Sequence, residues 1–270
     1  MTTVDLLAPA KVNLCLHVTG QRSDGYHLLD SIVMFADLGD RIALAPAPAM
    51  ALTVTGPRAA GVPDDARNLC WKAADRYGRA VSITLDKHLP AAAGIGGGSS
   101  DAAAVLRGLE RMTGRPPAFD PLALGADVPV CMLGRAARMT GIGEGVEPLD
   151  LPPLPAVLVN PGIEVPTPSV FRALPSKHNP PLDPIPEGAA PGVLIDWLAT
   201  QRNDLEPPAR AQAPVIGAVL AALAPARLAR MSGSGATCFG LCDSLTDAQA
   251  LADAIQAAHP GWWVAAVTLS

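Results

Sequence analysis

A glycine-rich run between a predicted strand and a predicted helix constrains this chain more than any other part of its sequence. The run, Pro90 to Asp101, reads PAAAGIGGGSSD. It follows the alternating pattern of Val81–Leu85 and precedes an apolar helical face at Ala102, Val105, Leu106 and Leu109. Glycine lets backbone N–H groups converge without interference from a Cβ atom, and a helix start adds unpaired N–H donors. The sequence therefore predicts a phosphate-binding cradle, with the Ser99 and Ser100 hydroxyls as further partners.

The spacing of the glycines excludes two other nucleotide motifs. No lysine in the chain follows a glycine, so the P-loop pattern G-x-x-x-x-G-K is absent. The dinucleotide pattern G-x-G-x-x-G needs a third glycine, but after Gly94 and Gly96 that place holds Ser99. After Gly96 and Gly98 it holds Asp101. The alternative interpretation of the run, a flexible loop whose serine caps the helix, stays open at this point.

A lysine and an aspartate form a candidate catalytic pair. Residues 9–19 alternate apolar and polar side chains, which predicts a half-buried strand with Lys11, Asn13 and His17 on one face. Asp127 lies in the sequence GADVP, just before a strand-like run, where a carboxylate among apolar residues needs a partner. Lys11 is the natural partner, although an N-cap or turn aspartate gives the same local sequence. In such a pair the carboxylate accepts a hydroxyl proton while the ammonium stabilises phosphoryl charge.

Three shorter features complete the motif analysis. Met231–Ala236 reads MSGSGA, which fits a second backbone nest for phosphate or a hairpin that contains a bulge. Thr246 and Gln249 form a capping box, which predicts the start of a helix. His27 follows a turn, and a lone histidine is more often structural than catalytic. The spacing of His, Cys and carboxylate residues predicts no metal site.

The composition excludes several classes of protein. With a net charge of −5 and only 4% aromatic residues, the chain has neither the charge of a nucleic-acid-binding face nor the aromatics of a base-stacking platform. No apolar run reaches membrane-spanning length and no signal peptide opens the chain. We therefore expect a cytoplasmic protein that binds neither nucleic acid nor membrane. Five cysteines without metal-type spacing indicate buried thiols in a reducing compartment.

The order of predicted elements favours an α+β fold with two domains, because strands and helices are interleaved without βαβ regularity. A stretch rich in proline and leucine, Leu149–Pro155, marks the boundary. We expect one domain over residues 1–152 and a second over residues 153–270. Within the second, Pro175–Pro191 is a loose, proline-rich segment.

Motifs spread over nearly the whole chain resemble those of the GHMP kinases, which are small-molecule kinases unrelated to P-loop enzymes. They are the glycine-rich run, GADVP, MSGSG, APAKVNL at Ala8–Leu14, DGYH at Asp24–His27, PTP at Pro166–Pro168 and NDLEP at Asn203–Pro207. Within the family, the motifs are most similar to those of members that act on 4-diphosphocytidyl-2-C-methyl-D-erythritol. One departure is Asp101, since the family often has Asn at that position.

The resemblance implies that the γ-phosphoryl group of ATP is transferred to the 2-hydroxyl of that compound, in the non-mevalonate route to isoprenoid precursors. Mg²⁺ would arrive on the phosphates of ATP, with no dedicated protein metal site. The family fold has an N-terminal domain with a left-handed βαβ unit and a ferredoxin-like C-terminal domain. We expect these small-molecule substrates as the only partners of a monomer or weak homodimer.

The resemblance also assigns residues to roles. The family's catalytic pair falls on Lys11 and Asp127. Its cytidine pocket has Tyr26 and Phe171 on either side of the base and falls on Asn13, Tyr26, His27 and Phe171. Its nucleotide loop falls on Pro90, Ala91, Ala92, Ala93, Gly94, Ile95, Gly96, Gly97, Gly98, Ser99 and Ser100.

Two alternative functions can be weighed on the same residues. A homoserine or mevalonate kinase of the same family has no base to recognise, and the Tyr26–His27 pair argues against it. A module that binds ATP without transferring phosphate needs no base facing an ammonium, so Lys11 with Asp127 argues against a sensor.

Overall fold

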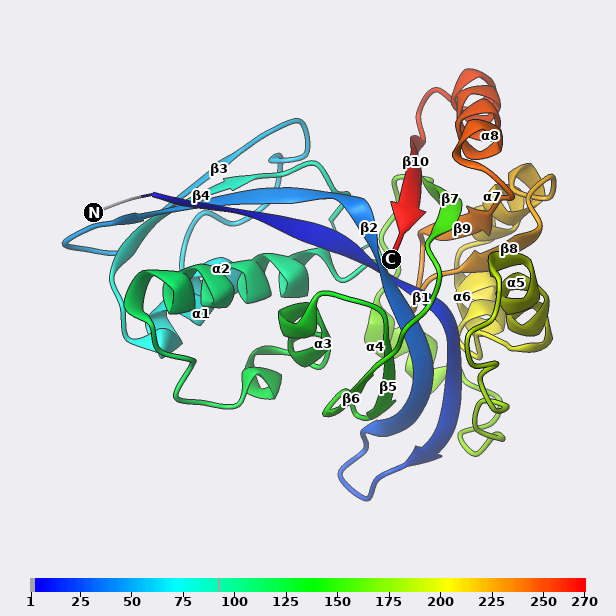
Figure 1. Ribbon diagram of the computed structural model, residues 1–270, viewed down its shortest axis with the longest axis horizontal. Helices are drawn as coiled ribbons and strands as arrows, with labels where there is room; N and C mark the ends of the chain where they lie inside the picture. Colours follow the sequence, from blue (N-terminus) through cyan, green and yellow to red (C-terminus); the bar gives the residue numbers. More distant parts are fainter. Residues whose placement is uncertain (1–2, 92) are drawn as a thin grey trace. The chain divides into compact units, whose positions relative to one another are not determined.

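The computed structural model describes residues 3–91 and 93–270 and divides them into two compact units. Unit 1 comprises residues 3–11, 38–91 and 96–134, and unit 2 comprises residues 12–37, 93–95 and 135–270. The strands β1 (Val4–Gln21) and β2 (His27–Pro46) run through both units (Figure 1). The predicted domain boundary between residues 152 and 153 stays a prediction.

Unit 1 is a sheet covered by helices. Strand β4 (Val81–Asp86) pairs in parallel with β3 (Ala51–Thr55) and antiparallel with the second half of β2. Helix α1 (Leu69–Tyr77) connects the two parallel strands, and its N-cap is Asn68, whose side chain accepts a hydrogen bond from the Cys70 N–H. The remaining elements are α2 (Gly97–Thr113), the 3-10 helix η1 (Pro121–Leu124) and α3 (Val128–Leu133).

Helix α2 is anchored directly on the sheet of unit 1. Its predicted apolar face is confirmed, because Ala102, Val105, Leu106 and Leu109 are completely buried. At Gly108, an added Cβ atom would lie 2.5 Å from Leu44 Cδ1 of β2 and 2.8 Å from Leu6 Cδ1 of β1. Figure 1 shows α1, α2 and α3 on the same side of these strands. This close packing of α2 against the sheet fixes the position of the N-terminus of the helix.

Unit 2 is built around an antiparallel sheet in the order β10-β7-β9-β8. The sheet joins the first half of β2 where Leu269 lies opposite Ala36. Its strands are β7 (Leu154–Asn160), β8 (Leu228–Met231), β9 (Cys238–Leu241) and β10 (Trp263–Leu269). Two further strands, β5 (Ala137–Gly141) and β6 (Gly145–Pro148), pair with each other, and β5 also pairs with β2.

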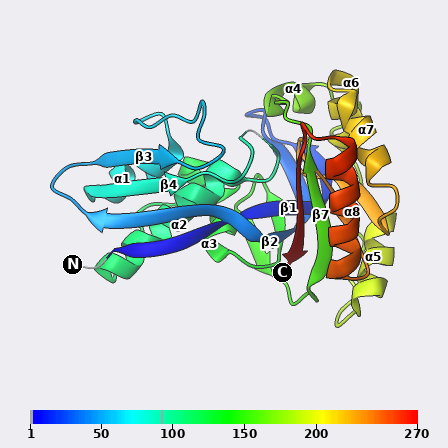
Figure 2. The same ribbon diagram turned by 90° about the horizontal axis from the view of Figure 1, so that it is seen from above.

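Helices cover this sheet and complete the core of unit 2. Figure 2 shows α8 (Leu245–Ala258) alongside β7, and its apolar residues Ala248, Ala252 and Ile255 are buried in the core. The other helices are α4 (Thr167–Arg172), α5 (Pro191–Thr200), α6 (Glu206–Gln212) and α7 (Val215–Ala222). The mixture of helices with mostly antiparallel strands confirms the predicted α+β class.

The structure corrects four local predictions. Helix α2 starts at Gly97, inside the glycine run, and not at residue 102. Asp127 precedes the helix α3 and not a strand. Residues 10–18 of the strand that carries Lys11 are buried on both faces and not half-buried, because other parts of the fold cover their polar side. Helix α8 is capped by Ser244, which accepts a hydrogen bond from the Asp247 N–H, and not by the Thr246 capping box.

The five cysteines are all buried and unbridged, as the sequence predicts for thiols. Cys70 and Cys131 belong to unit 1, and Cys15, Cys238 and Cys242 belong to unit 2. Burial raises the pKa of the Cys15 and Cys131 thiols to about 12. Across residues 3–91 and 93–270, the structure contains no helix with the length and apolar character needed to cross a bilayer.

Candidate active site

In unit 1, the first turn of α2 provides the strongest candidate for a phosphate site. The N-cap of the helix is Gly96, whose φ of 63° lies in the left-handed region that favours glycine. The N–H groups of Gly97, Gly98 and Ser99 are the first of the helix, and such groups have no partner within the helix. The Ser99 side chain is half-buried, whereas Ser100 is completely buried. This first turn therefore offers backbone N–H groups and the positive end of the helix dipole to an anion.

Lys11 and Asp127 meet in unit 1 beside this helix start. Lys11 Nζ lies 3.0 Å from Asp127 Oδ2, and the two side chains are 4% and 30% exposed. Asp127 occupies the N-cap position of α3, but its side chain caps no N–H of that helix. The carboxylate is directed to the ammonium instead. The predicted pair is thus a real ion pair, with Lys11 buried and Asp127 accessible.

Gly96 connects the ion pair to the glycine run. A Cβ atom at this position would lie 3.0 Å from Lys11 Cε and 3.8 Å from Asp127 Oδ2. A side chain here would crowd the lysine, and the positive φ of Gly96 would add backbone strain. The helix start, the ammonium and the carboxylate therefore form one compact constellation within unit 1.

A second cluster of charges lies directly behind the same helix start, and the sequence analysis did not find it. The Lys87 ammonium hydrogen-bonds to Asp40 and, at 2.9 Å, to Asp101 Oδ2. All three side chains are at most 5% exposed. Asp40 Oδ1 also accepts hydrogen bonds from the backbone N–H groups of His88 and Leu89, at 2.6 and 2.8 Å. We call Asp40, Lys87 and Asp101 the buried charge triad.

The triad holds together the two chain segments that flank the loop. Burial alone would lower the pKa of the Lys87 ammonium, but Asp101 and Asp40 raise it above its usual value. Asp40 fixes the backbone just after β4, and Lys87 links it to Asp101 in α2. The only signals in the sequence were the scarcity of lysine and the unexpected carboxylate at position 101.

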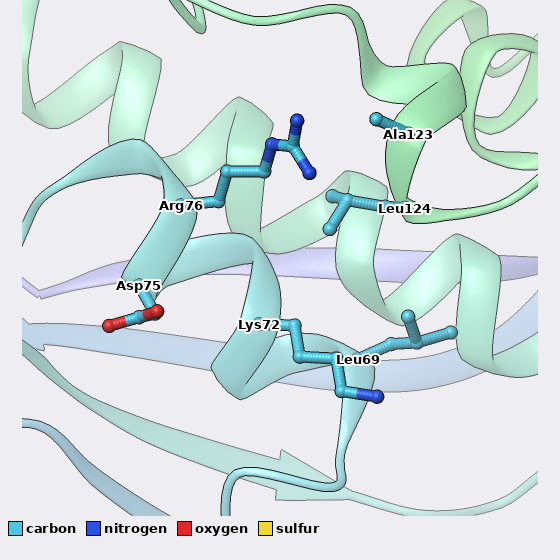
Figure 3. Close-up of a pocket in the computed structure, with 6 residues that line it drawn as sticks. All are labelled: Leu69, Lys72, Asp75, Arg76, Ala123 and Leu124. Atoms are coloured by element: carbon cyan, nitrogen blue, oxygen red, sulfur yellow. The ribbon is translucent and has the colours of Figure 1, made fainter.

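A cavity of about 440 Å³ lies between α1 and η1 (Figure 3). Its lining residues are Leu69, Lys72, Asp75 and Arg76 of α1 and Ala123 and Leu124 of η1. Leu69 also lies 3.6 Å from the position of a Cβ atom at Gly98. The cavity therefore borders the helix start through Leu69.

Unit 2 holds the middle of the predicted loop. Thr237 N–H donates to Ala93 O at 3.1 Å, and Ser232 Oγ donates to Gly94 O at 3.0 Å. Ser232 Oγ also accepts from the Asn13 N–H at 3.0 Å. The MSGSGA turn between β8 and β9 thus supports residues 93 and 94 of the loop. Ala92, another member of the predicted loop, lies outside the described residues, and Pro90 and Ala91 belong to unit 1.

The four residues predicted for the cytidine pocket all belong to unit 2. The His27 and Phe171 rings are stacked, with centroids 4.7 Å apart. Tyr26 is 61% exposed. Asn13 is buried, and its Nδ2 donates to Ser31 Oγ at 2.8 Å. The structure therefore brings Phe171 onto His27, whereas the predicted placement of Tyr26 and Phe171 on either side of a base stays a prediction.

The stacked ring of His27 carries a nitrogen, Nε2, that makes no hydrogen bond within the described residues. This nitrogen is also buried. Burial lowers the pKa of His27, and the charge of Lys177 lowers it further. Lys177 Nζ donates to Gln21 Oε1 at 3.0 Å, and Gln21 Nε2 donates to the Gly25 carbonyl in the turn before Tyr26. This ring is therefore kept neutral and ready to make a further hydrogen bond.

Comparison with known proteins gives consistent matches along the chain. The GHMP kinases N terminal domain model matches residues 67–135, and the GHMP kinases C terminal model matches residues 191–261. The chain is 62% identical to the 4-diphosphocytidyl-2-C-methyl-D-erythritol kinase of Dinoroseobacter shibae, over 97% of this chain and 93% of the relative. It is 55% identical to the enzyme of that name from Paracoccus denitrificans, over 97% and 96% of the two chains.

Solved structures give the same result. A crystal structure of 4-(cytidine 5'-diphospho)-2C-methyl-D-erythritol kinase superposes with a TM-score of 0.81 at 38% identity and covers 99% of both chains. The mevalonate kinase of L. major superposes with a TM-score of 0.69 at 17% identity, over 100% of this chain and 96% of that chain. At that identity, the second match shows the fold alone.

Proposed function

Because this chain belongs to the GHMP kinases, and within them to the 4-diphosphocytidyl-2-C-methyl-D-erythritol kinases, we propose that it phosphorylates the 2-hydroxyl of that compound with ATP. In this reaction, the hydroxyl oxygen attacks the γ-phosphorus and the bond between that phosphorus and the β,γ-bridging oxygen breaks. ADP leaves, and the proton of the hydroxyl is released. The product is the 2-phosphate of the diphosphocytidyl substrate.

The ion pair beside Gly96 is the observation that carries the proposal. Asp127 is accessible, so its carboxylate can accept the hydroxyl proton or orient the hydroxyl toward the phosphorus. Lys11, held 3.0 Å from that carboxylate, supplies positive charge for the oxygens of the transferring phosphoryl group. Phosphoryl transfer depends largely on positioning and on electrostatic stabilisation, which a rigid ion pair provides.

The first turn of α2 is the proposed site for the phosphates of ATP. Its backbone N–H groups and dipole match the charge of a triphosphate. Ser99 supplies a hydroxyl at the same turn. We propose that Mg²⁺ arrives on the phosphates, where it would neutralise part of their charge.

His27, Tyr26 and Phe171 are the proposed recognition residues for cytosine. The free Nε2 of His27 supports this role, because a buried polar atom without a partner within the protein is suited to a ligand atom. Phe171 fixes the ring of His27 by stacking, and the exposed ring of Tyr26 is available to a base. Asn13 is proposed as a further contact.

Substrate competition tests the proposal. Purified protein and ATP are supplied separately with the diphosphocytidyl compound, mevalonate and homoserine, and ADP release is followed by a coupled assay. We expect turnover with the diphosphocytidyl compound alone, and ³¹P NMR should show a new phosphomonoester on its 2-oxygen. Turnover of mevalonate or homoserine instead would refute the assignment, and binding of ATP without transfer to any alcohol would favour a sensor.

A further inference from the structure

The buried charge triad holds one more carboxylate than ammonium. Lys87 donates to both Asp40 and Asp101, and none of the three side chains is more than 5% exposed. Two ionised carboxylates on one ammonium would leave a net negative charge in the interior of unit 1. Such a charge is expensive to bury, and a proton on one carboxyl removes it.

Hydrogen bonding shows which carboxyl has room for that proton. Both oxygens of Asp40 accept hydrogen bonds, Oδ1 from two backbone N–H groups and Oδ2 from Lys87. Asp101 uses only Oδ2, and its Oδ1 is buried without a partner among the described residues. Burial raises the pKa of the Asp101 carboxyl to about 7; Lys87 opposes this shift, and the charge and hydrogen bonding of the adjacent Asp40 add to it. The exchangeable proton of the triad therefore belongs on Asp101.

Lys87 is the cation that contacts Asp101, and the thiols packed near Asp101 carry no charge to balance it. Cys70 of α1 and Cys131 of α3 are the further titratable groups that interact with it, and burial raises the pKa of both thiols, so both are neutral. Lys11, another buried cation of unit 1, is paired with Asp127. Asp101 thus responds mainly to Lys87, to Asp40 and to any charge that arrives at the helix start.

The triad lies close to Gly97, in the first turn of α2, where the phosphates are proposed to bind. A Cβ atom at Gly97 would lie 3.7 Å from Lys87 Nζ and 3.9 Å from Asp40 Oδ2. Gly97 itself therefore adds no side chain between an anion at its N–H and these buried groups, and Leu89 Cδ1 is the other atom within 4 Å of that position. A nearby negative charge favours the neutral form of a carboxyl.

We propose that Asp101 takes up a proton from solvent when ATP binds, so that the buried charge behind the phosphate loop is neutralised as the triphosphate arrives. The proposal rests on the ATP site proposed above and makes Asp101 a positioning residue, since it acts through Lys87 and the backbone of the loop.

Calorimetry measures this proton directly. The binding of a Mg²⁺-loaded, non-hydrolysable ATP analogue is titrated at pH 8 in buffers with different ionisation enthalpies. The dependence of the observed enthalpy on the buffer enthalpy gives the number of protons taken up. We expect uptake approaching one proton per site in the unmodified protein. Asp101→Asn should abolish most of the uptake while it retains binding, and Asp5→Asn, at an exposed carboxylate of β1, should leave the uptake unchanged.

Each outcome decides the question. Binding without proton uptake in the unmodified protein would overturn this inference and leave the ATP site intact. Failure of the analogue to bind would overturn the ATP site and this inference with it. Uptake that persists in Asp101→Asn would place the proton on another group. If Asp101→Asn fails to fold, infrared difference spectra of the unmodified protein still decide, because nucleotide should increase the band of a protonated carboxylic acid.

Discussion

Gly96 and Lys11 approach so closely that a Cβ atom on the glycine would lie 3.0 Å from Cε of the lysine. The glycine therefore shapes the surroundings of the ammonium as well as the start of α2. This double role separates Gly96 from glycines that serve only as turns or caps.

Gly96→Ala should impair turnover more than it impairs folding. The left-handed φ of 63° costs an alanine about 1–2 kcal/mol, and its methyl group would displace Lys11 from Asp127. Gly114→Ala is a matched control, because this C-cap of the same helix has a φ of 70° and open space around it. Both variants should lose similar thermal stability in calorimetry, but only Gly96→Ala should lose kcat. Equal kcat in the two variants would contradict the link to Lys11.

Asp127→Asn should lower turnover by roughly 10²–10⁴ with little change in substrate binding, because the amide cannot accept the hydroxyl proton. Lys11→Met should also lower turnover, since it removes charge from the transferring phosphoryl group. Steady-state kinetics of both variants and of the double variant provide the measurement. Residues that act as a unit give a double variant far less impaired than the product of the single effects. Near-normal turnover in Asp127→Asn would exclude it as the general base.

Tyr26→Ala should weaken the diphosphocytidyl substrate selectively. Stacking on a base contributes about 1–3 kcal/mol in nucleic-acid sites, which corresponds to a loss of about 5- to 150-fold in affinity. Tyr26 is largely exposed, so its removal should leave the fold intact. Separate titrations with the substrate and with ATP test this. A parallel loss of ATP binding would assign Tyr26 to the adenine site or to the fold.

His27 should titrate below its usual pKa of about 6.5, because burial and then the charge of Lys177 disfavour the imidazolium. A pKa lowered in this way keeps the ring neutral at pH 7, and protonation occurs only as the pH falls further. NMR titration of the ring protons measures the midpoint, and Lys177→Gln should move it upward without restoring the full value. The KM for the diphosphocytidyl substrate should rise at acidic pH in step with this midpoint. A midpoint at or above 6.5 in the unmodified protein would contradict the structure.

Local sequence patterns predict a helix or strand well where its conformation depends on its own residues and not on packing against other elements. The face of α2 from Ala102 to Leu109 follows from the periodicity of its apolar residues. The start of α2 was placed too late because glycine has a low helix propensity, and the packing of the helix on the sheet overrides it. The run after Asp127 looks like a strand because of its valines, but Pro129 fits the first turn of a helix.

Contacts between distant residues were harder to predict. Lys11 and Asp127 could be paired because each was conspicuous in its own segment. Asp40 and Lys87 are 47 positions apart, and nothing in the sequence around Asp40 distinguishes it from a surface aspartate. The burial of residues 10–18 of β1 on both faces likewise depends on what covers the strand, which alternation alone does not show.

Because every cysteine is buried, the native thiols can serve as probes of local opening. A maleimide can reach a thiol only after the surrounding structure opens, so the labelling rate of each cysteine reports the opening of its neighbourhood. Cys70 and Cys131 report on unit 1, and the other three report on unit 2. Mass spectrometry of labelled peptides would therefore show, without any engineered probe, in which unit a bound nucleotide or substrate slows cysteine labelling.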